Sequence, residues 1–210
     1  MKKIVLSLLA IVICCVAANA EVAPTSSKKS NAARIVSHYE APIKECNVVP
    51  RAIENGNTFA AEINGELHAF VIWGIYAPQR AERAKQDYFD ESKAALEKLI
   101  FGKTVKIVPR DPSGTLYARS GEYIEFRMTD KGNPLFSRTT RLHATVVQAY
   151  VGSTDIGAEQ LKKGAAWHFV AETKGSMPGY DALQRNAQSK ERGLWEEIDT
   201  PIPPWEWLKK

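Results

Sequence analysis

The side chains of this 210-residue chain that could do chemistry stand around one apolar segment, residues 70–79 (Phe-Val-Ile-Trp-Gly-Ile-Tyr-Ala-Pro-Gln). The amide oxygen of Asn57, which precedes the segment, can coordinate a hard cation but adds no negative charge. Tyr76 carries a neutral phenol, which is a poor calcium ligand at neutral pH. Gln79 ends the segment with an amide that cannot accept a proton from water. None of these three side chains carries a charge at neutral pH.

Three charged residues elsewhere in the chain could add to this set. Glu54 lies three residues before Asn57 and Glu82 lies three residues after Gln79, so a shifted loop could bring a carboxylate into the site. Arg141 could bind a phosphate group, or it could pair with a surface acid.

The histidines do not indicate a metal centre. His68 and His143 fall on expected strands, and His168 follows Trp167, but none of them has the spacing of metal ligands. No pairing of a carboxylate with a histidine is visible in the sequence. We therefore expect no zinc site.

The N-terminus has the pattern of a secretory signal peptide. Lys2 and Lys3 precede an apolar run from Ile4 to Ala18, and Ala18-Asn19-Ala20 offers a cleavage site after Ala20. A transmembrane anchor is the alternative, but the run is short for a bilayer span. We expect a periplasmic or secreted protein that keeps no membrane anchor after cleavage.

Cleavage would leave a chain of balanced charge with one cysteine, Cys46. Removing Lys2 and Lys3 from 28 basic residues leaves 26 against 24 acidic residues, a formal charge of +2. This balance neither requires nor excludes a polyanionic partner. Cys46 cannot form an intramolecular disulfide, and we expect it to be a buried small hydrophobic residue. Residues 21 to about 34 are poor in large apolar groups, and we expect a flexible leader over 21–43 before a single domain over 44–210.

Within that domain, the periodicity predicts strands first and helices later. Asn55-Gly56-Asn57 and Asn64-Gly65 are turn signals between strands expected over 46–53, 57–64 and 66–75. Further strands are expected over 104–108 and 142–151, with an additional hairpin over 115–128 that turns at Ser120-Gly121. Helices are expected over 91–101, from Asp155 to Gly164, and from Pro178 to near Gly193. The sequence thus predicts an α+β domain with a small antiparallel barrel.

Several of these segments together resemble the staphylococcal (thermo)nuclease-like family. Asn55-Gly56-Asn57-Thr58 stands where that family has Asp-Gly-Asp-Thr, and residues 74–79 stand where it has Gly-Ile-Asp-Ala-Pro-Glu. Residues 159–167 resemble its late helix and turn, and 193–195 with 201–207 resemble its tail. The resemblance covers about residues 46 to 207. It implies a five-stranded OB-fold β-barrel with about three helices, to which the hairpin is an addition.

The resemblance also implies a mechanism whose residues can be compared position by position. The family holds calcium with two aspartates, activates water with a glutamate and stabilises the phosphate with two arginines. In this chain Asn57 and Tyr76 occupy the calcium-ligand positions, Gln79 the glutamate position and Val71 the first arginine position. Arg141 alone matches, at the second arginine. Losing both anionic ligands should remove most of the calcium affinity, so we expect no cofactor, or Ca²⁺ if catalysis persists.

We therefore predict a catalytically inactive or strongly impaired nuclease homologue that acts as a nucleic-acid or protein binding module. Trp73, Tyr76 and Arg138 are the candidate substrate-binding residues beside Arg141, with the aromatic rings as stacking surfaces. Core packing is the alternative role of Trp73. Arg138, Arg141 and the adjacent Lys162 and Lys163 form a weak basic patch or a solvated face.

Two alternatives remain open at this stage. One is a divergent metal-dependent endonuclease that hydrolyses DNA or RNA. The other is a module that binds an envelope protein, with the hairpin at 115–128 as its contact surface. The expected partners are therefore single-stranded nucleic acid or an envelope protein. Three tryptophans of the tail, Trp195, Trp205 and Trp207, are expected to cover the core.

Overall fold

The computed structural model describes residues 43–81, 84–110, 123–129, 137–173 and 177–209, all within the unit Ala33–Lys210. The predicted signal peptide and residues 21–42 of the predicted leader lie outside these residues. Within them, no helix is both long and apolar enough to cross a membrane.

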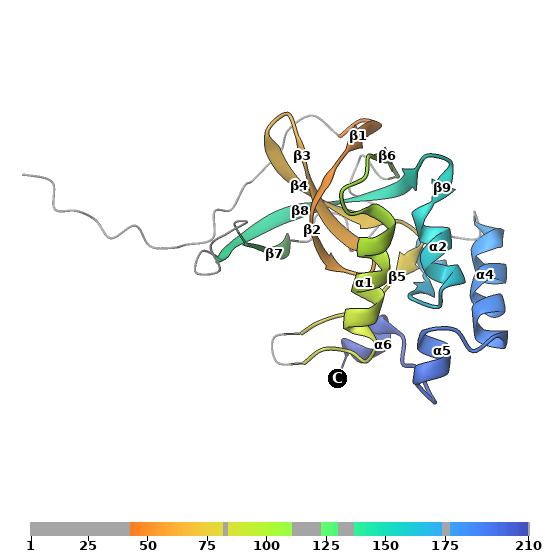
Figure 1. The fold of residues 1–210 in the computed structure, drawn as a ribbon. Coiled ribbons are helices and arrows are strands. Elements are labelled where there is room, and N and C mark those ends of the chain that lie inside the picture. Colours follow the sequence, from red (N-terminus) through yellow and green to blue (C-terminus); the bar gives the residue numbers. More distant parts are fainter. Residues whose placement is uncertain (1–42, 82–83, 111–122, 130–136, 174–176, 210) are drawn as a thin grey trace, which may run out of the picture. The chain divides into compact units, whose positions relative to one another are not determined.

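A curled eight-stranded sheet is the centre of the fold (Figure 1). Its main path runs in the order β1-β6-β8-β4-β3-β2, and β7 and β9 each pair with β8. The strands are β1 Cys46–Val48, β2 Pro50–Asn55, β3 Thr58–Ile63, β4 Glu66–Ile72, β6 Val105–Pro109, β7 Tyr123–Thr129, β8 Ser137–Val151 and β9 Thr154–Asp155. A second, two-stranded sheet pairs β5 Ile75–Tyr76 with β10 Trp167–His168. The predicted α+β class and OB-like barrel are confirmed.

The two predicted turns close hairpins between the first long strands. Asn64 and Gly65 both have positive φ angles, 53° and 83°, as a tight turn between β3 and β4 requires. Gly56 and Asn57 separate the paired residues Asn55 and Thr58 at the end of the β2–β3 ladder. The side chain of Asn57 is therefore presented at one end of the sheet.

Strand β8 joins the halves of the sheet. Its residues 144–147 pair in parallel with β4, and residues 147–150 pair antiparallel with β6. Its first residues, 137–143, pair antiparallel with β7. Residues 123–129, the second half of the predicted hairpin, therefore pair with the extended β8. The predicted turn at Ser120-Gly121 lies outside the described residues. Residues 111–122 lie outside the described part.

The described residues form six helices: α1 Phe89–Ile100, α2 Ile156–Lys162, α3 Val170–Thr173, α4 Pro178–Ser189, α5 Leu194–Glu197 and α6 Pro204–Trp207. The three longest match the three that the periodicity predicts. The side chain of Asp155 accepts a hydrogen bond from the Ala158 backbone N–H over 3.1 Å and so caps α2. The three others are single turns of four residues, too short to show a helical period in the sequence.

Two apolar clusters lie on the opposite faces of β4, because alternate residues of a strand point to opposite sides. Phe70 and Ile72 belong to the main core, which also contains Leu96 of α1 and Leu161 of α2. Ala69, Val71 and Trp73, which alternate with them along the chain, belong to a second cluster. We call it the outer cluster; its buried members are Ala60, Ala69, Val71, Trp73, Leu142, Ala144 and Val146.

Candidate functional site

Asn57 is buried, with 1% of its surface exposed, and both ends of its side-chain amide are hydrogen-bonded within the protein. Its Nδ2 group donates to the carbonyl oxygen of Ile75 over 3.2 Å. Its Oδ1 atom accepts from the Ala77 backbone N–H over 3.4 Å. The amide thus joins the β2–β3 turn to β5 and the residue that follows it.

Gln79 belongs to a second set of amide hydrogen bonds beside Asn57. Its Oε1 atom accepts from Asn55 Nδ2 over 3.4 Å, and its Nε2 group donates to the carbonyl oxygen of Ala77 over 2.8 Å. Its backbone N–H donates to Gln86 Oε1 over 3.1 Å. We call Asn55, Asn57, Gln79 and Gln86 the amide network. All four side chains are electrically neutral.

Val71 and Tyr76 are both packed among apolar groups. Val71 is 3% exposed in the outer cluster, opposite Thr58 of β3 and Val146 of β8. The ring of Tyr76 is half-buried and packs edge-on against Phe169, with centroids 5.3 Å apart, and against Trp205, at 6.2 Å. Phe169 and Trp205 are in contact at 5.2 Å. These three half-buried rings, the aromatic lip, lie beside the amide network.

Trp73 is 5% exposed in the outer cluster, so its ring forms part of a core wall. The guanidinium carbon of Arg110 lies 4.7 Å from the ring centroid. The indole Nε1 group is buried and has no hydrogen-bond partner among the described residues. Sequence reasoning missed Arg110, because its contact with Trp73 joins residues 37 positions apart and depends on the packing of β6 against β8.

The predicted basic residues are separated along two elements. Arg138 and Arg141 lie on β8, opposite Met128 and Glu125 of β7, and their side chains lie outside what the structure describes. On α2, the ammonium group of Lys162 pairs with Glu159 over 2.6 Å. Lys163, at the C-cap of α2, is exposed. The weak basic patch therefore includes one lysine that is already paired.

The family model of the staphylococcal nuclease homologues matches residues 69–197. The chain belongs to this family. It is 31% identical over 148 residues to "Probable staphylococcal-like nuclease CAN2" of Oryza sativa subsp. japonica, which covers 70% of this chain and 31% of that protein. It is 28% identical over 134 residues to an "Uncharacterized endonuclease" of Escherichia coli O157:H7, and the match covers 63% of this chain and 65% of that protein. A protein of Haemophilus influenzae with the same description is 26% identical over 166 residues, and the match covers 79% of this chain and 73% of that protein. The chain thus spans about a third of the length of the rice relative.

Members of this family are typically calcium-dependent, and the residues of this site do not fit the ion. Calcium prefers several oxygen ligands with carboxylates among them. Asn57 Oδ1 already accepts a backbone N–H, and Tyr76 is packed in the aromatic lip. Among the described residues, no three His, Cys, Asp or Glu side chains are grouped to hold a metal ion.

Two acids of this staphylococcal nuclease homologue near the site, Glu54 and Glu172, are hydrogen-bonded to other groups. Glu54 accepts a hydrogen bond from Arg80, and Glu82 lies outside the described residues. Glu172 of α3 is 1% exposed, and its carboxylate accepts from the backbone N–H of Gly74 over 2.5 Å. Gly74 has φ +78°, and an added Cβ would lie 2.9 Å from Thr173. Glu172 therefore holds the backbone of the 70–79 segment at Gly74.

A histidine network that the sequence did not reveal holds the C-terminal helices. His168 Nδ1 lies 2.6 Å from Asp181 Oδ1, and Nε2 lies 3.0 Å from Thr173 Oγ1. This pairing of a carboxylate with a histidine was not visible in the sequence, because it joins β10 to α4 across 13 residues. His168 is 4% exposed, and this network joins β10, α3 and α4.

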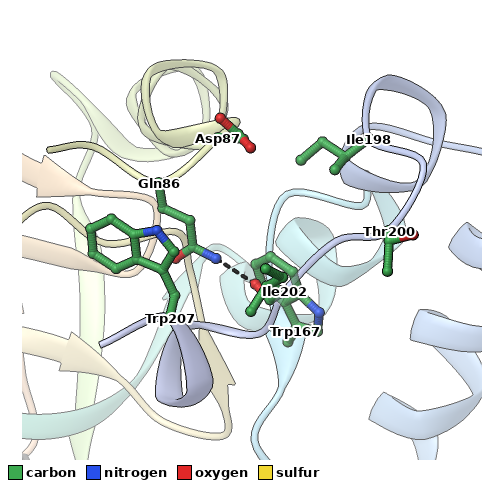
Figure 2. A pocket seen from close by; sticks show the side chains of 7 residues that line it. All are labelled: Gln86, Asp87, Trp167, Ile198, Thr200, Ile202 and Trp207. Atoms are coloured by element: carbon green, nitrogen blue, oxygen red, sulfur yellow. Dashed lines mark hydrogen bonds between the residues drawn. The ribbon is translucent and has the colours of Figure 1, made fainter. Parts of the chain in front are cut away.

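A small cleft of about 50 Å³ lies between the loop before α1 and the tail (Figure 2). Gln86 Nε2 donates to the carbonyl oxygen of Ile202 over 2.5 Å, as the dashed line in Figure 2 marks. The lining residues are Gln86, Asp87, Trp167, Ile198, Thr200, Ile202 and Trp207. Gln86 belongs to both the cleft and the amide network, so the tail is connected directly to the site.

Cys46 is the free cysteine of the described residues and is half-buried on β1. Burial raises the pKa of its thiol. The predicted small hydrophobic role is thus partly met, because the side chain packs against the main core but keeps some exposure.

Proposed function

We propose that this staphylococcal nuclease homologue binds single-stranded nucleic acid and hydrolyses it very slowly or not at all. The observation that carries the proposal is the amide network. At the family's metal-ligand and base positions, Asn57 and Gln79 have both ends of their amides hydrogen-bonded to other protein groups.

The proposed loss of catalysis follows from what phosphodiester hydrolysis needs. The attacking water must lose a proton to a base, and the phosphate must be stabilised as negative charge develops on it. Gln79 cannot act as the base, and Val71 is a buried apolar residue where the family has an arginine. A hard cation would also have to compete with the Ala77 N–H for Asn57 Oδ1.

Binding requires less than hydrolysis, and two features of the chain support it. OB-fold barrels bind single strands by stacking bases on aromatic rings and by placing cationic groups against phosphates. Tyr76, Phe169 and Trp205 offer three partly exposed rings at the edge of the site. Two arginines could contact phosphates. Arg110, directly after β6, is exposed, and Arg141 lies on β8.

Two assays on purified protein test the proposal. Plasmid nicking and RNA digestion, each with calcium, magnesium, manganese or a chelator, should show no metal-dependent cleavage. Binding to a fluorescent single-stranded oligonucleotide should be detectable at about 50 mM salt and should weaken as salt rises. Metal-dependent cleavage that Arg141→Ala abolishes would contradict the proposed inactivity. Absence of binding at low salt would contradict the nucleic-acid role and favour an envelope-protein partner.

We propose further that the protein acts in the periplasm or outside the cell. The support is the N-terminal pattern of two lysines, an apolar run and Ala18-Asn19-Ala20. N-terminal sequencing of the protein from fractionated cells should find Glu21 first in the extracytoplasmic fraction. Recovery of the full-length chain in the cytoplasm would contradict this localisation.

A further inference from the structure

Arg110 occupies a position from which it can do the work of the arginine missing at position 71. Val71 of β4 is paired with Val146 of β8, and the backbone N–H of Arg110 donates to the carbonyl oxygen of Val146 over 3.0 Å. Neighbouring strands lie about 4.8 Å apart, so two strand steps separate Arg110 from Val71 by roughly 10 Å. An arginine side chain is long enough to cover much of that distance.

The guanidinium of Arg110 is held by stacking rather than by an acid. It lies over the ring of Trp73, 4.7 Å from the centroid, and Trp73 is itself fixed in the outer cluster. A guanidinium that stacks through its face keeps the N–H groups of its edge available for a planar, bidentate acceptor. Among the described residues, Arg110 has no side-chain hydrogen bond or ion pair.

The same stacked pair holds a second unused donor. Trp73 is only 5% exposed, and its buried Nε1 group has no hydrogen-bond partner among the described residues. An unsatisfied buried N–H is costly, so such groups usually have a ligand or a water as acceptor. Arg110 is the exposed donor of this pair, and the ligand that it suits is an anion with several acceptor oxygens.

The nearby acid does not neutralise Arg110. Asp155 lies close enough that it and Arg110 shift the pKa of Tyr150 in opposite directions. However, the carboxylate of Asp155 already accepts from the Ala158 N–H over 3.1 Å and from the Tyr180 hydroxyl over 2.8 and 3.0 Å. It forms no ion pair with Arg110. Among the described residues, no acid pairs with Arg110, and its charge is available for an anionic ligand.

We infer that Arg110, stacked on Trp73, binds a phosphate of the nucleic acid and takes over the role lost at Val71. This inference rests on the proposed function and names a residue and a chemical group for it. We call Arg110 stacked on Trp73 the clamp; it presents a guanidinium and no carboxylate, and so needs no metal ion. Phosphate binding at this place should therefore be unaffected by a chelator.

Titration of the protein with inorganic phosphate tests the clamp without a nucleic acid. The readout is the ¹H,¹⁵N signal of the Trp73 indole N–H, assigned by its loss in Trp73→Phe. Phosphate should shift this signal in the wild type, with and without a chelator, and should shift it much less in Arg110→Gln. No shift in the wild type, or an equal shift in Arg110→Gln, would overturn the inference.

Oligonucleotide binding then places the clamp in the proposed function. Arg110→Gln should weaken binding about tenfold and reduce the slope of log affinity against log salt by about 0.7, as for one lost phosphate contact. Arg110→Lys keeps the positive charge but cannot make a bidentate contact, so its affinity should lie between those of the wild type and Arg110→Gln. Arg185→Gln, which removes an equal charge from the exposed surface of α4, is the matched control and should change binding less than twofold.

The two sets of results separate the two proposals. If phosphate shifts the indole signal through Arg110 but the oligonucleotide does not bind, the clamp stands and the nucleic-acid function fails. If the oligonucleotide binds equally well to Arg110→Gln and the wild type, the function stands and the clamp is wrong. Circular dichroism and thermal unfolding of each variant establish that the fold is intact.

Discussion

The side chain of Asn57 donates to the carbonyl oxygen of Ile75 over 3.2 Å, at the place where the family has a calcium-binding aspartate. An aspartate cannot make this bond, because an ionised carboxylate only accepts hydrogen bonds. The residue that replaces the metal ligand has therefore become part of the fold itself. This relationship makes the first prediction one about stability.

Asn57→Asp should destabilise the protein by about 2 kcal/mol, because it places a buried carboxylate against a carbonyl oxygen. The loss should be measured by urea unfolding at neutral pH. It should be smaller in acid, where the carboxyl group becomes protonated and can donate. Asn47→Asp, on the exposed surface of β1, is the matched control. Equal stability of Asn57→Asp and the wild type would show that the Asn57 bond is unimportant.

Calcium should not stabilise the wild-type protein, and restoring the anionic positions should create that response. In a variant with Asn57→Asp, Tyr76→Asp and Gln79→Glu, three carboxylates would stand at the end of β2–β3 and β5. Calcium would then bind the folded state alone and raise the unfolding temperature. Thermal unfolding at increasing calcium concentrations, with magnesium in parallel, measures this effect. A rise in the wild type of comparable size would contradict our interpretation of the amide network.

The sequence allowed the positions of the first strands and their turns to be predicted, because those signals are local. Asn64-Gly65 is a turn signal whatever surrounds it, and both residues have positive φ angles. The signature segments also placed Asn57, Tyr76 and Gln79 in one site. Their neutral side chains were therefore interpretable before the structure was known.

What the sequence did not provide are contacts between residues far apart in the chain. His168 meets Asp181, Glu172 meets Gly74, and Arg110 stacks on Trp73, and each pair depends on how separate elements pack. The pairing of β7 with β8 was missed for a related reason. The turn signal at Ser120-Gly121 is local, whereas the register between residues 123–129 and 137–143 depends on how the two strands meet in the sheet.

Gln86→Ala should loosen the tail, because this side chain joins Ile202 to Gln79. The substitution leaves a carbonyl oxygen and a backbone N–H without their partner, at a cost of about 1–3 kcal/mol. Hydrogen exchange should accelerate in residues 198–208 more than in β4. Gln188→Ala, at an exposed position of α4, provides the control. Uniform acceleration over the whole domain would indicate global destabilisation and would contradict a local link.

Cys46 should make the folded protein less stable at alkaline pH. Burial raises the pKa of its thiol in the folded state, so the unfolded chain loses this proton at a lower pH than the folded chain does. Above the unfolded-state pKa the unfolded chain binds fewer protons, and the free energy of unfolding therefore falls as pH rises. Urea unfolding from neutral to alkaline pH, under reducing conditions, should show a steeper decline in the wild type than in Cys46→Ser. Because of the same pKa shift, iodoacetamide should modify the folded protein only at a higher pH than the urea-unfolded chain. Identical pH profiles of modification in the two states would contradict the proposed effect of burial.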